Sequence, residues 1–313
     1  MNDPAVDAMI RRVSNWGRWG EDDELGTLNH ITPRVRAQAA ESIVSGQVLS
    51  LAIPFGRAGP QPPGLARLNP QQTMLQTGTD VAAGVQDGCS DGFGYADDQI
   101  AFATHAATHW DALAHAFYDY RMYNDRPCTL VDATGARANS IDRLHDRIVT
   151  RGVLVDVPRA LGESWLALGH EITVDDLERA LELQGVTLRT GDALLIRTGN
   201  MGRARRDGGW DRFTFDDEPG LGLAALPFIN EHGIAAIGTD NWAFEVLPNP
   251  SEIFLPVHAA GIVHMGLLLG ELFELDALAE ACAADGRYDF LLSAPPLPLV
   301  GSVGGPVNPI ALR

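Results

Sequence analysis

The sequence predicts an α/β fold with parallel strand pairings. Two observations carry this prediction: apolar, β-rich runs alternate with helical segments from Arg151 onward, and capping residues bound several of those helical segments. The chain has 313 residues, of which 45% are hydrophobic and 20% charged, so it can bury a sizeable core. No repeat, heptad pattern or clear linker divides the sequence. We therefore expect a single compact domain over residues 1–313.

The first third of the chain is expected to be irregular and rich in β-structure. Thr32 can cap a short helix over residues 33–40, because a proline follows it at the first helical position. Residues 47–54 resemble a strand, whereas residues 56–72 are rich in proline and glycine and predict a long surface loop or flap. We expect residues 1–75 to form an N-terminal extension and flap within the single domain.

The rest of the chain predicts four strands that alternate with helices. The predicted strands are residues 152–157, 192–198, 234–238 and 267–272, and the predicted helices are residues 174–184, 221–232, 256–265 and 276–284. Thr173 can cap the first of these helices, Gly185 can end it, and Asp276 can cap the last one. Pro227 is an unusual residue for the interior of the second helix.

The charge balance is acidic, with a formal net charge of -18. This sign repels phosphate backbones and anionic membranes, so we expect a small-molecule substrate and neither a nucleic-acid nor a membrane partner. The 3 cysteines are odd in number and widely spaced, which favours neither a disulfide framework nor a cysteine-rich zinc site. The polar N-terminus does not resemble a signal peptide, and no uncharged apolar run reaches membrane-spanning length. A cytoplasmic location is therefore expected.

Four polar residues with metal-binding and proton-transfer chemistry fall within eleven positions: His105, His109, Asp111 and His115. Histidine and carboxylate are the usual ligands of zinc and of harder divalent ions such as manganese. A helix would place His105 and His109 on one face but would point Asp111 elsewhere. A strand would place the two histidines roughly 13 Å apart, too far for one ion. The segment must therefore turn if these side chains share a metal, and two small alanines leave room for a turn.

The segment H-A-A-T-H-W-D-A-L-A-H resembles the signature H-x-G-T-H-x-D-x-x-x-H of the metal-dependent cyclase family, which includes bacterial kynurenine formamidase and isatin hydrolase. The resemblance implies that His105, His109 and Asp111 bind metal. It implies that His115 is the catalytic acid and base. It also implies a swivelling β/β/α cyclase-like fold and assembly into a homodimer or homotetramer.

The resemblance extends over most of the chain. Further matching segments run from Trp19 to Asn29, from His115 to Asn124, from Gly238 to Pro248 and from Gly304 to Ala311. Two positions depart from the commoner pattern. Ala107 replaces a glycine, which is a small-for-small change, and Leu113 stands where shorter members often have proline, which alters the expected pocket wall.

His258 and Glu271 match the places where the kynurenine formamidase branch holds a second ion, with the motif aspartate bridging. On one continuous helix these two side chains would face away from each other. They can meet if the helix ends near Gly266 and a strand returns Glu271 to the site. Isatin hydrolase-like members use one ion, so one or two ions are expected, and nitrogen and oxygen ligands accept both Zn²⁺ and Mn²⁺.

The expected reaction is hydrolysis of a cyclic or linear amide or of a small lactone by metal-activated water, with His115 as general acid and base. Trp110, Tyr123 and Trp242 are candidates for lining an aromatic substrate pocket. Two alternatives stay open. One is a cyclase or dehydratase of polyketide-like intermediates, and the other is a non-catalytic metal-binding protein that keeps the ligands.

Overall fold

The computed structural model describes residues 3–62, 66–86, 88, 92–210, 213 and 217–313. Within these residues, nine strands form one sheet in the spatial order β1-β17-β15-β9-β11-β13-β14-β4-β16. They are β1 (Val48–Ser50), β4 (His109–Asp111), β9 (Val149–Asp156), β11 (Ala193–Arg197), β13 (Ala236–Thr239), β14 (Leu268–Glu271), β15 (Asp289–Ser293), β16 (Gly304–Pro306) and β17 (Ile310–Leu312). The central strands β9, β11, β13 and β14 are parallel, and antiparallel strands flank them on both sides. The α/β prediction is therefore confirmed.

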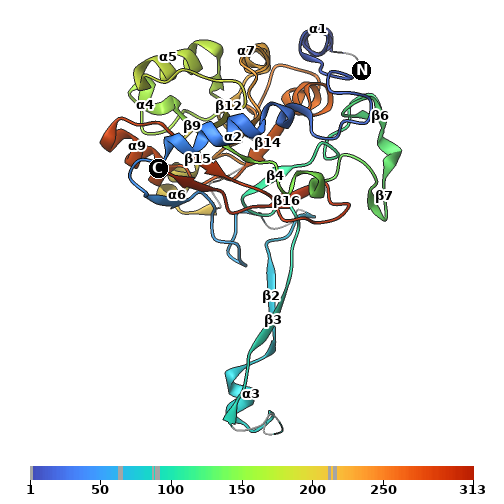
Figure 1. Cartoon of the computed structure of the whole chain (residues 1–313), viewed down its shortest axis with the longest axis vertical. Coiled ribbons are helices and arrows are strands. Elements are labelled where there is room, and N and C mark those ends of the chain that lie inside the picture. Colours follow the sequence, from blue (N-terminus) through green and yellow to red (C-terminus); the bar gives the residue numbers. More distant parts are fainter. Residues whose placement is uncertain (1–2, 63–65, 87, 89–91, 211–212, 214–216) are drawn as a thin grey trace.

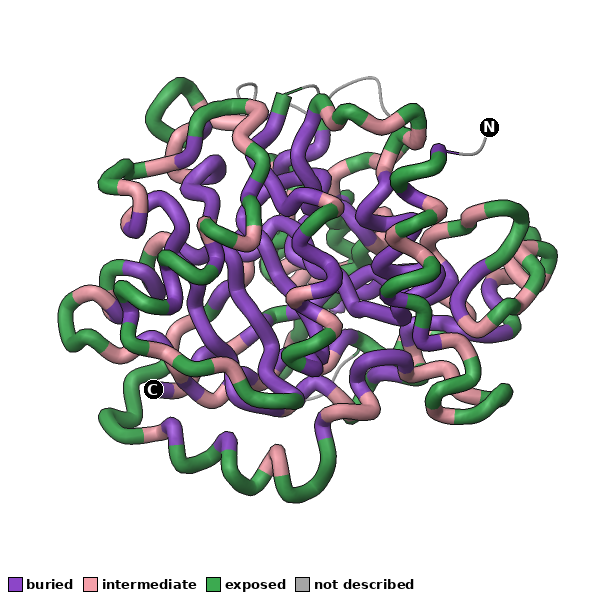
Figure 2. Tube along the Cα trace, turned by 90° about the horizontal axis from the view of Figure 1, so that it is seen from above, coloured by how far each residue is buried: buried purple, intermediate pink, exposed green. Residues whose placement is uncertain are grey.

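Helices pack around the sheet, whose central strands lie in the buried interior (Figures 1 and 2). The helices are α1 (Pro4–Val13), α2 (Pro33–Ala39), α4 (Val157–Leu161), α5 (Val174–Gln184), α6 (Asn200–Asp207), α7 (Leu226–Glu231), α8 (Pro256–His258), the π-helix η8 (Ala259–Met265) and α9 (Asp276–Asp285). Short ladders join β5 (Arg121–Met122) to β6 (Arg126–Pro127), β7 (Val131–Asp132) to β8 (Gly135–Ala136), and β10 (Glu171–Ile172) to β12 (Gly220–Leu221). Within the described ranges, no helix is long and apolar enough to cross a membrane.

The capping signals place two helices correctly. Thr32 accepts a hydrogen bond from the backbone N–H of Val35, and α2 begins at the proline that follows Thr32. Thr173 forms a capping box with Asp176 at the start of α5, which ends at the left-handed Gly185. Side-chain caps therefore mark the start of both helices, and a left-handed glycine marks the end of α5.

Three predicted helices differ from the observed ones. The second predicted helix begins later, at α7, because Pro227 is tolerated only in a first turn. A short 3₁₀ helix over Leu223–Ala225 precedes α7, and β12 ends at Leu221. Asp276 is the first residue of α9 and does not cap it, because its carboxylate instead accepts a hydrogen bond from Arg197. The third predicted helix is mostly the π-helix η8, which ends at Gly266 with a φ of 68°.

Residues 1–75 contribute more than an extension to the fold. The edge strand β1 pairs with β17, and Leu51 is fully buried in the core. Most of the predicted flap at residues 56–72 is loop, although positions 63–65 lie outside the described residues. The chain then forms an arm of β2 (Gln71–Gln76), the short helix α3 (Gly78–Ala82) and β3 (Asp97–Ala101), which projects far from the body (Figure 1).

Candidate metal centre

Strand β4 presents His109 and Asp111 on one face of the sheet. Successive side chains of a strand point to opposite faces, so the two residues that flank Trp110 share a face that its indole does not. Both side chains are buried, with exposed fractions of 0% for His109 and 1% for Asp111. The Nε2 atom of His109 lies 3.4 Å from Oδ1 of Asp111. The short strand thus supplies two adjacent donor atoms.

A turn brings His105 to the same two residues. Residues 104–108 are turns and bends, as the ligand spacing predicted, and Nε2 of His105 lies 3.3 Å from Oδ1 of Asp111. The imidazole lies against Gly304, where an added Cβ would come within 2.2 Å of its Nε2 atom. The Nε2 amide of Gln61, from the flap, donates 3.0 Å to the carbonyl of Ala106 and holds the turn.

Strand β14 returns Glu271 to the site. It pairs antiparallel with β4, and Glu271 is the register partner of His109. Oε2 of Glu271 lies 3.4 Å from Nε2 of His109. This return depends on the left-handed end of η8 at Gly266, so the predicted reversal of the chain before Glu271 is confirmed.

His258 enters from α8 and is held by a residue that the sequence did not single out. Its Nε2 atom lies 3.7 Å from Oδ2 of Asp111 and 3.6 Å from Oε1 of Glu271. The fully buried Glu245 accepts a hydrogen bond from Nδ1 of His258 at 2.6 Å. Glu245 also accepts from the backbone N–H groups of Val257 and His258, at 2.9 and 3.0 Å. This carboxylate therefore fixes both the ring and the start of its helix.

The five side chains form two groups of three that share Asp111. One group is His105, His109 and Asp111, and the other is Asp111, His258 and Glu271; in each, the donor atoms lie within 4.8 Å of one another. Four buried donor atoms here have no hydrogen-bond partner within the described part of the chain: Nε2 of His105, Nε2 of His109 and both oxygens of Asp111. Buried polar groups are nearly always satisfied, so four converging exceptions point to a bound cation.

The pKa values of the buried histidines in the cluster shift in opposite directions. Burial lowers the pKa of His105 to about 4. Burial also opposes the charged form of His109, but Asp111 and Glu271 outweigh it and raise the pKa to about 9. At His258 the carboxylate partners again outweigh burial and raise the pKa to about 10. Without an ion, protons on these two imidazoles balance the buried carboxylates, and a metal would replace them.

His115 lies at the edge of the cluster. Its Nε2 atom is 3.9 Å from Oδ1 of Asp111, and its ring centroid is 4.3 Å from that of His105. Its side chain is 26% exposed, the largest exposed fraction in the cluster, so the ring faces both the buried donors and the outside. Burial lowers the pKa of His115, although the nearby Asp111 works against this shift.

Comparison with known proteins identifies the family. The family description "Putative cyclase" matches residues 21–246. The chain belongs to this cyclase family. A solved structure described as a novel cyclase is 38% identical, with a TM-score of 0.89 over 96% of this chain and 100% of that chain. The cyclase-like fold implied by the sequence is thereby confirmed.

More distant solved structures share the fold. Isatin hydrolase A from Labrenzia aggregata is 17% identical, with a TM-score of 0.61 over 88% of this chain and 97% of that chain. A structure described as a predicted metal-dependent hydrolase from Bacillus stearothermophilus is 17% identical, with a TM-score of 0.52 over 85% of this chain and 97% of that chain. No curated protein matches the chain.

The three aromatic residues predicted to line a substrate pocket lie in different surroundings in this cyclase-family member. Trp110 is fully buried, and its indole N–H donates 2.9 Å to the carbonyl of Ala294 on the side of β4 away from the ligands. Tyr123 is also fully buried, and its hydroxyl donates to Asp23 at 2.9 Å. Trp242 is 8% exposed and lies beneath the guanidinium of Arg67, 5.2 Å from the ring centroid. The rings of Trp110 and Tyr123 therefore pack in the core, whereas Trp242 packs in a cluster with Ala107 of the turn that carries His105, and its role as a pocket residue stays a prediction.

An apolar cavity of about 750 Å³ adjoins the turn that carries His105. Its lining includes Ala107 and Thr108 of that turn. Phe55 and Phe102, whose rings meet edge to face at 5.2 Å, form part of its outer wall. Neither the five side chains of the two groups nor His115 lines this cavity, so it is a space beside the candidate metal centre.

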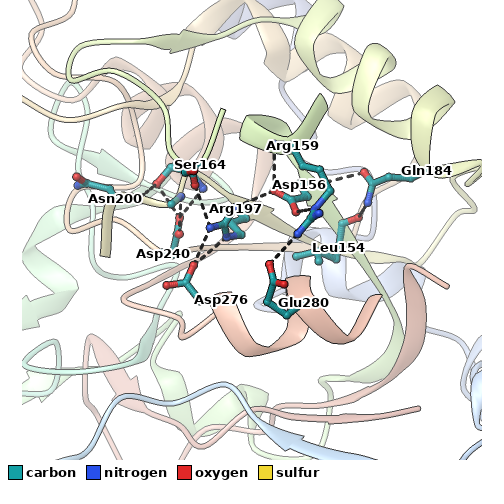
Figure 3. A network of polar contacts seen from close by, with 12 residues as sticks. Leu154, Asp156, Arg159, Ser164, Gln184, Arg197, Asn200, Asp240, Asp276 and Glu280 are labelled. Atoms are coloured by element: carbon teal, nitrogen blue, oxygen red, sulfur yellow. Dashed lines mark hydrogen bonds and ion pairs between the residues drawn. The ribbon is translucent and has the colours of Figure 1, made fainter. Parts of the chain in front are cut away.

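A second set of charged residues lies at the carboxyl ends of the parallel strands (Figure 3). Arg197 donates 2.9 Å to Asp156 and 2.9 Å to Asp276, while Asp240 accepts from the backbone and hydroxyl of Thr198. Burial raises the pKa of Asp240 to about 6. Because these carboxylates are paired with protein donors, the network joins strands and helices and is not a second candidate metal centre.

Proposed function

We propose that this chain is a metal-dependent hydrolase that cleaves a cyclic or linear amide, or a small lactone. The observation that carries the proposal is the convergence of four buried donor atoms without hydrogen-bond partners in the described chain. The distant likeness to an isatin hydrolase supports this reaction class, because isatin contains a cyclic amide.

The residues fit a divalent metal with mixed nitrogen and oxygen ligation. His105, His109 and Asp111 would hold one ion, and Asp111, His258 and Glu271 would hold an ion on the other side. Imidazole and carboxylate suit both Zn²⁺ and Mn²⁺. When bound, such an ion lowers the pKa of a ligated water and polarises a carbonyl oxygen.

His115 is the residue placed to move protons. Its pKa is lowered by burial, so the ring is neutral at neutral pH and can accept a proton from the attacking water at Nε2. The same atom then donates that proton to the leaving nitrogen or oxygen. The partly exposed ring can meet a small substrate, whereas the more deeply buried ligands hold the centre.

The test combines metal content with turnover. Elemental analysis of the purified chain should find stoichiometric Zn²⁺ or Mn²⁺, and a His109→Ala variant should lose it. A His115→Ala variant should keep the metal and lose most turnover on a panel of cyclic amides, linear amides and lactones. No metal in the wild type after incubation with either ion would refute the proposal, and unchanged turnover in the His115 variant would remove that residue from the mechanism.

A second candidate reaction is ring closure, because the relative that is 38% identical is described as a cyclase. Hydrolysis and cyclisation of one lactone pair differ only in direction, so both directions should be assayed on the same pair. Net ring opening under dilute conditions supports the hydrolase. A protein that binds metal stoichiometrically and converts no compound in either direction would be a metal-binding protein without this activity.

A further inference from the structure

The π-helix η8 connects two of the candidate metal ligands. It continues α8 directly after His258 and ends at Gly266, from which β14 leads to Glu271. The N–H of Gly266 donates to the carbonyl of Gly261, five residues earlier, which is the hydrogen-bond pattern of a π-helix. A helix with this pattern turns less per residue than an α-helix. The winding of η8 therefore sets the direction of His258 relative to the strand that carries Glu271.

The carboxyl end of η8 is bound by residues of the N-terminal segment, whose helix α1 packs against η8 (Figure 1). The indole N–H of Trp16 donates 2.7 Å to the carbonyl of Val263. The backbone N–H of Asn15 donates 2.9 Å to the carbonyl of His264, and its side-chain amide donates 2.9 Å to the carbonyl of Met265. Two neighbouring residues therefore satisfy three consecutive carbonyls that the end of a helix leaves without partners.

The turn after η8 is bound by the 3₁₀ helix η1 (Gly26–His30) of the same N-terminal segment. The backbone N–H and the hydroxyl of Thr27 donate 2.9 and 3.1 Å to the carbonyl of Gly266. A Cβ on Gly26 would come within 2.1 Å of that oxygen, so glycine permits this close approach. Asn15 and Thr27 are 4% and 1% exposed, and an unpaired carbonyl is costly at such a depth. The end of η8 is therefore held in the orientation that meets these donors.

The start of the same helical segment is held by Glu245. This buried carboxylate accepts from the backbone N–H groups of Val257 and His258 and from Nδ1 of His258. Both ends of the segment are thus fixed by partners outside it. Rewinding η8 as an α-helix would rotate its last carbonyls away from the donors of Asn15 and Trp16, or would rotate His258 away from Glu245. The N-terminal donors therefore favour the π winding over the commoner α winding.

We propose that Asn15 and Trp16 are positioning residues for His258. By binding the end of η8 they hold the π winding that turns Nε2 of this histidine toward Asp111 and Glu271, at 3.7 and 3.6 Å. This role rests on the proposed function, because it concerns a ligand of the proposed ion. A purely structural role would lower the free energy of unfolding but would leave the metal affinity of the folded protein unchanged.

The test is a double-mutant cycle on the Zn²⁺ affinity of the full chain, measured by competition with a chelator. Trp16→Phe removes the indole N–H and keeps a ring for the stack on His264, whose centroid lies 4.5 Å from that of Trp16. Asn15→Ala removes the amide donor and keeps the backbone donor. Together the two substitutions should lower the affinity about 10-fold, the smaller end of the effect of an orienting partner. In a His258→Ala background they should leave the affinity unchanged, because the ligand that they position is absent.

Arg12→Ala is the matched control, because Arg12 lies on the same N-terminal segment but pairs with Glu231 of α7. It should keep the wild-type affinity. Trp16→Phe alone removes one hydrogen bond, so it carries the same cycle with a smaller effect if the double variant does not fold. Equal affinities in the wild type and the Asn15 and Trp16 variants would overturn the positioning role and leave the proposed metal site standing. So would a loss that persists in full in the His258→Ala background. A wild type that binds neither Zn²⁺ nor Mn²⁺ would instead refute the proposed function and this role together.

Discussion

Replacing Glu245 with glutamine should weaken metal binding while leaving the fold intact. One oxygen of Glu245 accepts from the backbone N–H and Nδ1 of His258, and the other accepts from the N–H of Val257. A glutamine keeps the first oxygen but turns an NH₂ group toward the N–H of Val257, and it removes the charge that favours a donating Nδ1. Loss of such an orienting partner costs about 10- to 100-fold in metal affinity, or roughly 1.4–2.7 kcal/mol.

Glu218→Gln is the matched control for this prediction. Glu218 is also fully buried, and one of its oxygens accepts from the N–H groups of Trp242 and Ala243. Burial raises the pKa of Glu218 well above its usual value, which favours the neutral acid that glutamine imitates. Competition with a fluorescent chelator should show a lower metal affinity in Glu245→Gln and an unchanged metal affinity in Glu218→Gln. Equal affinities in the wild type and both variants would refute the orienting role of Glu245.

Two further predictions follow from shifted pKa values. His109 and His258, with pKa values of about 9 and 10, hold protons at pH 7 without an ion, so metal binding should release about two protons and tighten as pH rises toward 9. Calorimetry in buffers of different ionisation enthalpy measures this release, and no release would contradict it. Burial lowers the pKa of His264 to about 4, so the stability that its neutral form contributes is present above pH 6.5 and lost as pH falls toward 4. Between pH 7 and 4.5, the free energy of unfolding in urea should therefore fall by about 2 kcal/mol more in the wild type than in a His264→Phe variant. The phenylalanine keeps a ring against Trp16. Equal decreases in the two proteins would exclude His264 as the cause.

The sequence predicted a turn between the candidate ligands because ligand chemistry restricts the backbone. A helix or a strand alone could not bring His105, His109 and Asp111 together, so a turn was required, and residues 104–108 form one. The same reasoning could have placed Trp110 in the core, since alternation along β4 points the residue between two ligands to the opposite face. Its type suggested a substrate contact, but its position on the strand determines its surroundings.

Other features could not be predicted from local patterns. Glu245 lies in an irregular segment where no periodicity applies, and the signal available was a lone carboxylate in the apolar run A-F-E-V. The π-helix η8 has the same apolar composition as an α-helix, so the sequence predicted a helix but not its winding. The strands of the arm were not predicted because β2 and β3 are mostly polar and exposed. Neither face of the hairpin packs on a core, so the sequence shows no alternation of apolar and polar residues there.

The way Asp111 is shared bears on the number of ions that the site would hold. Its Oδ1 atom faces His105 and His109, at 3.3 and 3.4 Å, whereas its Oδ2 atom faces His258 at 3.7 Å. Donor atoms around one tetrahedral zinc ion lie about 3.4 Å apart, a spacing that the His105 side of Asp111 matches. Glu271 also links the two halves, because its Oε2 atom lies 3.4 Å from Nε2 of His109. A carboxylate that turns one oxygen to each half is suited to bridge two ions.

This arrangement predicts two ions per chain at saturation and one in each half-site variant. His105→Ala should keep an ion on the His258 side, and His258→Ala should keep one on the His105 side, because Asp111 serves both halves. Elemental analysis after equilibrium dialysis against Zn²⁺ or Mn²⁺ gives the stoichiometry. If the wild type held one ion and either substitution removed it completely, all five side chains would belong to a single coordination sphere.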